Sequence, residues 1–248
     1  MRRGFWRGLI ACGLLGCITF GCGHLATENT KQIVQETNVA QLLTEAKDNQ
    51  IAKDLWNLGN SYLDSQRYQE AISAYDRAIA IKSDSAETWV NRGNALTALQ
   101  NYQEALISYD RAIAIRPNKH EAWYNRGNAL TALRRYSEAV KAYDESIAIK
   151  PEKHEAWINR GIALTKMQSY KAALASYNQA LTIRKDLHQA YYNKACNFAL
   201  QNNIESTIEN LSKAIQLLPD KYRKLAQTDS DFDQVRNNQQ FQDLIQGN

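Results

Sequence analysis

The chain has 248 residues, a formal net charge of +4 and four cysteines. This length leaves room for one or two ordinary domains. Three of the positive charges are Arg2, Arg3 and Arg7, so the rest of the chain carries only +1, which is +4 minus 3. The charge therefore does not indicate a nucleic-acid-binding surface, which requires basic residues gathered on one face.

The N-terminal segment is typical of a signal peptide. The basic residues Arg2, Arg3 and Arg7 precede an uncharged stretch, 8–23, and residues 1–21 contain no Asp or Glu. The stretch is too short and too rich in glycine for a confident membrane-spanning helix, which needs about 20 apolar residues. We therefore expect residues 1–21 to be a signal peptide that directs export.

Three cysteines in this segment resemble the lipidation site of bacterial lipoproteins, where a signal peptidase cuts before a cysteine that follows a small residue. We favour Cys22 because it leaves the longer apolar segment before the cut, and Cys17 is the alternative, whereas Cys12 lies too close to Arg7. The resemblance implies an exported lipoprotein anchored to a membrane and facing outside the cytoplasm. The other interpretations are an uncleaved anchor and a simple secretory signal, which would give a periplasmic or secreted soluble protein.

Residues 22–51 are expected to form a tether and a short N-terminal helix. The segment 24–38 is polar, whereas Val39, Leu42 and Leu43 have helical spacing. We predict that residues 39–50 form a short helix that covers the first of the repeats described next.

From residue 52 onward the sequence repeats every 34 residues without gaps, in units 52–85, 86–119, 120–153, 154–187 and 188–221. Within each unit, positions four and eleven are bulky and position eight is small. These positions have the spacing i, i+4, i+7, so they lie on one face of a helix, which we call helix A. The residues at position eight are Gly59, Gly93, Gly127, Gly161 and Ala195.

The second half of each unit predicts a further helix, helix B. Positions seventeen, twenty, twenty-four and twenty-seven recur with helical spacing, and position twenty-four is tyrosine in the first four units. Glycine inside a helix costs about 1 kcal/mol relative to alanine, so glycine at position eight indicates close packing of helix A on helix B. The chain's prolines all occupy position thirty-two, where they would stop helix B: Pro117, Pro151 and Pro219.

The motif W-x-x-R-G-x-x-L, followed by Ala, Tyr, Ala and Pro at these offsets, resembles the tetratricopeptide repeat over residues 52–221. The resemblance implies an all-α, right-handed superhelical solenoid of five helix-turn-helix repeats with short helical caps. We expect residues 222–248 to form the C-terminal capping helices, because a solenoid end otherwise exposes apolar surface. Trp56 departs from the motif by one position, and the fifth unit has Lys194, Ala195 and Thr207 in place of Arg, Gly and Ala.

Asparagine occupies position six in all five units and position nine in the first three. These positions lie opposite the buried stripe of helix A, on the face that lines the concave groove in the tetratricopeptide-repeat family. Such a column of amides can pair with the main chain of an extended peptide, and it resembles the asparagine ladder of O-linked N-acetylglucosamine transferase; alternatively, the amides satisfy only local hydrogen bonds. The predicted ligand-binding residues are Asn57, Asn91, Asn125, Asn159, Asn193, Asn60, Asn94 and Asn128, with Tyr124 and Tyr192 from the apolar position five beside them.

Two further sets of residues have structural interpretations. His120, His154 and His188 begin three units but cannot share a metal ion, because neighbouring helices lie about 8–10 Å apart and metal–nitrogen bonds are about 2.0–2.1 Å long. Basic residues at position seven are predicted to pair with position twenty-five of the unit before. The predicted ion pairs are Arg92 with Asp76, Arg126 with Asp110, and Arg160 with Asp144.

The repeats carry no glycine-rich phosphate loop, metal-ligand motif or Ser/His/Asp set, and Cys196 is expected to be a partly exposed, unreactive thiol. We therefore predict a non-enzymatic scaffold or adaptor that binds a protein or peptide in its groove and uses no cofactor, metal or nucleic acid. In plan it resembles bacterial repeat-containing lipoproteins that help assemble envelope machinery such as pili. The alternative is a permanent structural subunit of an envelope complex that packs through the outer face of its solenoid.

Overall fold

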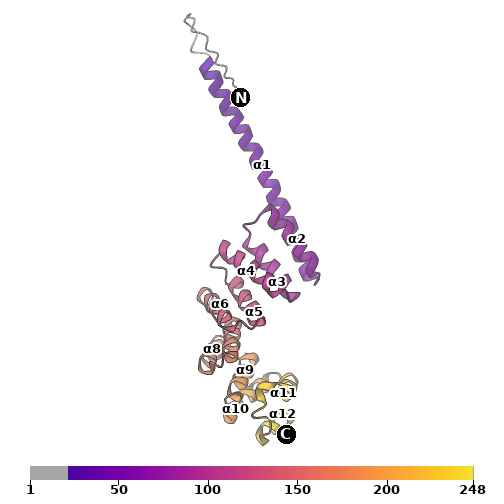
Figure 1. Ribbon diagram of the computed structural model, residues 1–248, viewed down its shortest axis with the longest axis vertical. Helices are drawn as coiled ribbons and strands as arrows, with labels where there is room; N and C mark the ends of the chain where they lie inside the picture. The colour runs from indigo at the N-terminus through magenta and orange to yellow at the C-terminus, as the bar shows by residue number, and fades with distance from the viewer. Residues whose placement is uncertain (1–21, 248) are drawn as a thin grey trace, which may run out of the picture. The chain divides into compact units, whose positions relative to one another are not determined.

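The computed structural model describes the backbone of residues 22–247 and the side chains of residues 31–247. Within these residues every regular element is helical, with twelve α-helices and one 3₁₀-helix (Figure 1). The predicted all-α fold is confirmed. The predicted signal peptide, with Cys17, lies outside the described residues. None of the described helices is long and apolar enough to span a membrane.

Helix α1 runs from Cys22 to Asp64 without a break. We expected a tether followed by a short helix, but residues 24–58 contain neither glycine nor proline, so no residue in this segment interrupts the helix. The chain divides into one unit that ends at residue 50 and a second that spans residues 51–248. In the first unit, Val39, Leu42 and Leu43, which we expected to cover the first repeat, are exposed.

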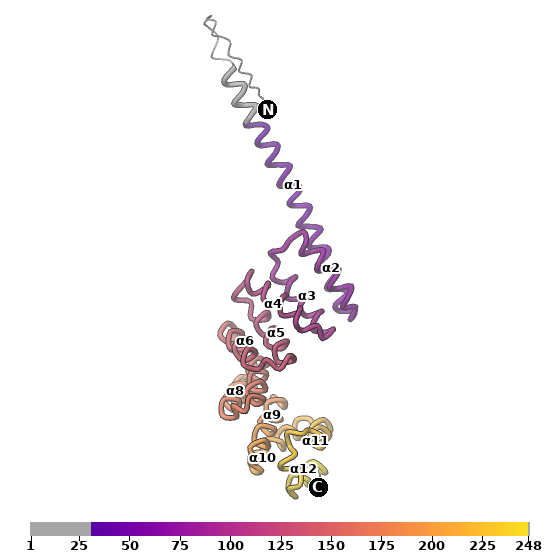
Figure 2. Tube along the Cα trace, in the orientation of Figure 1, coloured from indigo at the N-terminus to yellow at the C-terminus, as the bar shows by residue number. Residues whose placement is uncertain are grey.

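The second unit is a stack of helix pairs, which Figure 2 traces along the chain. The end of α1 is helix A of the first repeat, and the later helices A are α3 (Ala86–Ala98), α5 (His120–Ala132), α7 (His154–Lys166) and α9 (His188–Ala199). The helices B are α2 (Tyr68–Ile81), α4 (Tyr102–Ile115), α6 (Tyr136–Ile149), α8 (Tyr170–Ile183) and α10 (Ile204–Leu217). Each helix B from α2 to α8 packs against helix A of the next repeat as well as its own partner. The predicted solenoid is therefore confirmed.

The glycine at position eight lets helix B approach helix A. A Cβ atom added at Gly93 would lie 2.5 Å from Cε1 of Tyr109, which is closer than van der Waals contact allows. The same overlap occurs between Gly59 and Tyr75, Gly127 and Tyr143, and Gly161 and Tyr177. In the fifth repeat the fully buried Ala195 and Leu211 take the places of the glycine and the tyrosine. The sizes of the residues at positions eight and twenty-four are therefore matched, as glycine with tyrosine or as alanine with leucine.

Each helix A ends at a residue in the left-handed conformation at position fifteen. In the second repeat this residue is Gln100, with φ of 61°, and the next N–H, of Asn101, donates to the carbonyl of Leu96 at 2.9 Å. These bonds are those of a Schellman motif, in which glycine is the usual residue. Here the residues are Gln66, Gln100, Arg134, Gln168 and Asn202.

The turn from helix B to the next helix A is held by tryptophan and proline. The indole N–H groups of Trp123 and Trp157 donate to the carbonyls of Pro117 and Pro151 at 2.8 and 2.9 Å. Helices α4 and α6 end two residues before these prolines, as the sequence predicted. Pro219 differs because it opens a new helix, α11 (Pro219–Thr228).

The C-terminal segment covers the open end of the fifth repeat with α11, the 3₁₀-helix η1 (Ser230–Phe232) and α12 (Gln239–Gln246). Phe232, Val235 and Phe241 are fully buried, as a cap requires. The Tyr192 ring of α9 stacks on the Tyr222 ring of α11, with centroids 4.8 Å apart. The end of the solenoid is therefore a packed aromatic core.

Replacing Gly93 with alanine tests the fit between position eight and the tyrosine. We expect Gly93→Ala to lower the free energy of unfolding by about 1–3 kcal/mol, because the added Cβ overlaps the Tyr109 ring. In a Tyr109→Leu background, which copies the Ala195 and Leu211 pair, the same change should be neutral or stabilising, because it then adds only helix propensity. Urea unfolding of the four proteins in this double-mutant cycle measures the difference. An equal cost in both backgrounds would contradict the fit.

Candidate functional site

Asparagines of neighbouring repeats are joined by hydrogen bonds on one face of the helices A, the face that carries positions six and nine, which we call the asparagine face. The Nδ2 of Asn91 donates to Oδ1 of Asn60 at 2.9 Å, and that of Asn125 donates to Oδ1 of Asn94 at 2.8 Å. Asn159 donates in the same way to Oδ1 of Asn128, at 2.9 Å. Position six of one repeat is therefore bonded to position nine of the repeat before.

The carbonyl oxygens at position nine also accept hydrogen bonds from buried tyrosines. The hydroxyl of Tyr109 donates to Oδ1 of Asn94 at 3.0 Å, and that of Tyr143 donates to Oδ1 of Asn128 at 2.9 Å. Tyr75 bonds to Asn60 likewise, at 2.8 Å. These oxygens are fully used within the protein, since a carbonyl accepts two hydrogen bonds. The alternative interpretation, that the asparagines satisfy local hydrogen bonds, therefore holds for the carbonyl oxygen of each position-nine amide.

The other half of the amide has no partner among the described residues in five of the six asparagines. In Asn60 and Asn94 the Nδ2 group donates to none of them, whereas Asn128 is hydrogen-bonded through its side chain to Tyr124. In Asn91, Asn125 and Asn159 it is Oδ1 that accepts from none. All six side chains are partly exposed. The first two repeat interfaces therefore each offer one amide donor and one amide acceptor on the asparagine face, and the third offers an acceptor.

Position five, expected to add apolar contacts beside the asparagines, is mostly buried between the repeats. Val90 and Ile158 are 5% and 2% exposed. Tyr124 is partly exposed, its hydroxyl accepts from Nδ2 of Asn159 at 3.1 Å, and Nζ of Lys153 lies 4.5 Å from its ring centroid. Tyr124 is thus the position-five residue that stands beside the network, and it orients Asn159.

The C-terminal segment covers the fifth repeat on the asparagine face. Tyr192 is 8% exposed, and its hydroxyl donates to Oδ2 of Asp229 at 2.8 Å. Lys166, on α7, bonds to Asp231 of η1 at 3.2 Å, so the cap also reaches the fourth repeat. Tyr192 is therefore occupied by the protein's own C-terminal segment, and Asn193 lies at the capped end of the column.

Cys196 is buried, at 4% exposure, rather than partly exposed as expected, because the cap covers it. Burial, together with the nearby carboxylates of Asp229 and Asp231, raises the pKa of its thiol well above the usual value. The ligand atoms of these three residues lie within 4.8 Å of one another. Tyr192 and Lys166 already bond to the two carboxylates, and a protonated thiol is a poor metal ligand. This cluster is best explained by attachment of the cap.

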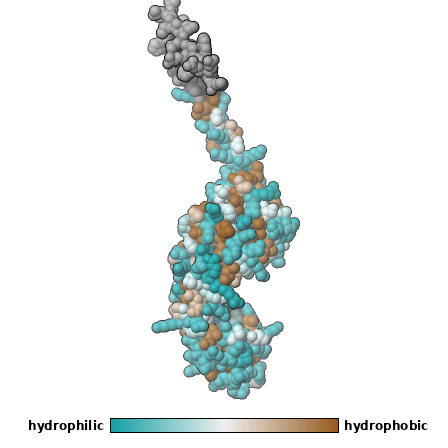
Figure 3. Space-filling model, in the orientation of Figure 1, coloured by the Kyte–Doolittle hydropathy of each residue, from teal (hydrophilic) through white to brown (hydrophobic). Residues whose placement is uncertain are grey.

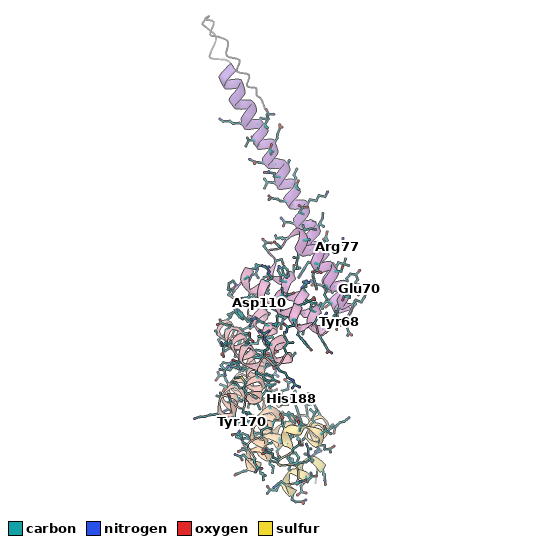
Figure 4. All side chains as sticks on the ribbon, in the orientation of Figure 1. Tyr68, Glu70, Arg77, Asp110, Tyr170 and His188 are labelled. Atoms are coloured by element: carbon teal, nitrogen blue, oxygen red, sulfur yellow. The ribbon has the colours of Figure 1, made fainter. Side chains whose placement is uncertain are left out.

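The predicted ion pairs between repeats are confirmed, with Arg–Asp distances of 2.6, 2.7 and 2.6 Å for Arg92, Arg126 and Arg160. Figure 4 labels one of the acceptors, Asp110, on α4. His120, His154 and His188 begin α5, α7 and α9, as expected of helix-start residues, and Figure 4 also labels His188. Arg–Asp pairs as exposed as these affect the register of the repeats more than the free energy of unfolding.

Comparison with known families decides the identity of the repeats. Models described as tetratricopeptide repeat match residues 57–120, 120–153 and 154–187, which is more than half of the chain. The chain belongs to the tetratricopeptide-repeat family. Proteins of this family bind protein partners, and this chain shares their helix pairs. Among curated proteins, none matches it significantly.

Solved tetratricopeptide-repeat structures have a similar fold. YrrB, described as a tetratricopeptide-repeat protein with an unusual peptide-binding site, is 23% identical with a TM-score of 0.62, covering 73% of this chain and 92% of YrrB. PilW, described as a type IV pilus biogenesis factor, is 20% identical with a TM-score of 0.68, covering 79% and 90%. MamA from Desulfovibrio magneticus RS-1 is 19% identical with a TM-score of 0.65, covering 69% and 97%. At these identities the likeness establishes the fold alone.

The buried tyrosines predict a loss of stability at alkaline pH. Burial raises the pKa of Tyr109 to about 12, compared with about 10 in an unfolded chain. Between these values the unfolded chain loses the Tyr109 proton while the folded protein keeps it, so the free energy of unfolding falls as the pH rises. Below pH 10 both states are protonated and this effect disappears.

Tyr109→Phe removes the ionisable group and should make the decrease in unfolding free energy between pH 9 and pH 12 smaller by about 2 kcal/mol. At pH 9 the variant should be less stable than the natural protein by about 1 kcal/mol, because it loses the bond to Asn94. Urea unfolding of both proteins at the two pH values measures both effects. The same pH dependence in both proteins would refute the assignment to Tyr109.

Proposed function

We propose that this chain is a non-enzymatic scaffold that binds an extended segment of a partner protein along the asparagine face. The proposal depends on how the two asparagines of each bonded pair, at position six of one repeat and position nine of the repeat before, use their amide groups. One half of the pair is held by the fold, and at the first two repeat interfaces the other half presents a donor and an acceptor that have no partner among residues 31–247. A peptide main chain offers the complementary carbonyl and N–H groups at every residue.

Rigidity of the amides supports this function. Asn159 is held by Asn128 and by the Tyr124 hydroxyl, so its free Oδ1 points in a fixed direction. Asn94 is held in the same way by Tyr109 and Asn125. Groups that are already ordered lose little entropy on binding, which favours affinity.

Two carboxylates beside the asparagines are already paired within the protein. Glu87 bonds to Arg116 and, at 3.4 Å, to Lys119, and Glu155 lies 3.9 Å from Lys153. At Glu87 and Glu155 recognition would therefore depend more on hydrogen bonds and shape than on unpaired charge. This differs from carboxylate recognition, which requires unpaired basic side chains.

The similar structures are consistent with the proposal. YrrB is described as having a peptide-binding site, and PilW as a biogenesis factor for an envelope structure, the type IV pilus. The alternative, a permanent subunit that packs through its outer face, requires a large exposed apolar patch. On the face drawn in Figure 3, apolar residues of the repeats are interspersed with hydrophilic ones.

An isosteric change separates ligand binding from the internal network. In Asn60→Asp/Asn94→Asp, the acceptor for the tyrosine hydroxyl and the neighbouring asparagine is kept, while the free Nδ2 donors become carboxylate oxygens. We expect the doubly substituted protein to capture its partner at least about tenfold more weakly, because two hydrogen bonds are lost and two carboxylates face the partner's carbonyls. A cross-linking pull-down from membranes, quantified by mass spectrometry, measures the capture.

The matched control is Asn178→Asp, which adds the same charge at position twenty-five of helix B. The three preceding repeats have aspartate at this position, and Asn178 itself is exposed, so the fold accepts the change. Its capture of the partner should equal that of the natural protein. If the double variant folds normally and captures the same proteins equally well, the asparagine face is not the binding surface.

We also propose that the scaffold is exported and lipid-anchored through Cys22. Support comes from the basic and then apolar N-terminal sequence and from the small residue before this cysteine. Lipid anchoring would concentrate the scaffold at a membrane surface, where stable attachment requires more than one acyl chain.

In a bacterial host, Cys22→Ser should abolish incorporation of a fatty-acid label and move the protein from the membrane to the soluble or precursor fraction. Cys17→Ser, as the control, should leave both unchanged. Labelling that survives Cys22→Ser but is lost with Cys17→Ser would move the anchor to Cys17. Absence of labelling in the natural protein would reject lipidation.

A further inference from the structure

A hollow lies on the asparagine face between the third and fourth repeats. Its volume is about 150 Å³, and it is lined by Asn128 and Thr131 of α5, Tyr143 of α6, and Asn159 and Ile162 of α7. A cavity of this size can accept a group as large as benzene. The hollow is therefore large enough for one aliphatic side chain.

The chemistry of the lining selects against charged occupants. Position nine is asparagine in the first three repeats, but in the fourth it is Ile162, which gives the hollow an apolar wall. The fully buried Tyr143 ring forms its floor, and none of the lining side chains is charged. Burying a charged group there without a partner would be unfavourable, whereas burying an aliphatic one is favourable.

The rim of the hollow carries one of the unpartnered amide groups. It is Oδ1 of Asn159, whose Nδ2 is bonded to Asn128 and to Tyr124, while the Asn128 side chain is itself hydrogen-bonded to Tyr124. An extended peptide could thus bond through its main chain to the rim while one of its side chains enters the hollow. Alternation of side chains along an extended segment would direct the neighbouring side chains away.

We infer that this hollow binds one aliphatic side chain, such as leucine, isoleucine or valine, of the extended partner segment. The inference rests on the proposed function, because the segment must lie along the asparagine face. It adds a specificity that the amides alone lack, since they pair with any main chain. Specificity of this kind comes from one well-packed anchor among more tolerant contacts.

The test uses the full chain in mild detergent and an array of immobilised eleven-residue peptides of alternating alanine and serine. The central residue is alanine, valine, leucine, asparagine, lysine or aspartate. The natural protein should bind the leucine or valine peptide about tenfold more tightly than the alanine peptide, as expected from burying two or three more carbon atoms. Lysine and aspartate should give no gain.

Two variants remove the preference in different ways. Ile162→Trp fills the hollow, and Ile162→Asn restores the asparagine that the first three repeats have at this position. Both should bind all peptides within about twofold of the alanine peptide. Because the fold already accepts asparagine at position nine, Ile162→Asn remains informative if the tryptophan variant is poorly folded. Ile107→Trp, at a side chain of α4 that is 59% exposed, is the matched control and should keep the preference.

The outcomes separate this inference from the proposed function. Binding of all peptides with equal affinity would overturn the hollow as a specificity site and leave the asparagine face intact. An aliphatic preference that survives both Ile162 variants would also overturn it, because the preference must then arise elsewhere. Failure of the natural protein to bind any peptide in the array would overturn both proposals.

Discussion

The contact between the glycine at position eight and the tyrosine at position twenty-four is the constraint on which the rest of the repeat depends. A Cβ atom at Gly127 would lie 2.5 Å from the Tyr143 ring, so only glycine allows helix B to approach this closely. The ring spans the space between the helices and delivers its hydroxyl to the asparagine face, where it donates to Asn128. One close approach in the core therefore orients a polar group on the surface.

The hydrogen bonds between asparagines of neighbouring repeats favour ligand binding, because they fix the orientation of the amides before a ligand arrives. A single free amide on a helix would rotate, and its ordering on binding would cost entropy. Here the oxygen at position nine is fixed by a tyrosine and by the next repeat, which leaves the nitrogen in a defined direction. The stacking of repeats thus determines both the shape of the surface and the direction of its hydrogen-bonding groups, as expected where each repeat contacts only its neighbours.

The periodicity was sufficient to predict the helices, the close approach at the glycines, the ends of α4 and α6 and the Arg–Asp pairs, because all of these follow from residues that recur at a fixed offset. It was not sufficient for features without a residue signal. The left-handed turn at position fifteen carries Gln100 or Arg134 where glycine is usual, so the sequence did not mark it. The continuation of helix α1 through residues 24–38 follows from the absence of a breaker, which apolar spacing does not detect. The hydrogen-bond partners of the asparagines and the burial of Cys196 depend on contacts between repeats and with the cap.

The fourth and fifth repeats depart from the pattern in ways that limit where a ligand can bind. Ile162 ends the run of asparagines at position nine, and the next equivalent residue, Cys196, lies beneath the C-terminal cap. The cap is tied to α9 through Tyr192 and to α7 through Lys166, so it covers the face that the earlier repeats leave open. The hydrogen-bonded asparagine pairs accordingly stop at the interface of the third and fourth repeats, beside the hollow. A segment bound along the asparagine face would therefore have its uniform main-chain contacts toward the first repeat and its selective contact at Ile162, which fixes its register.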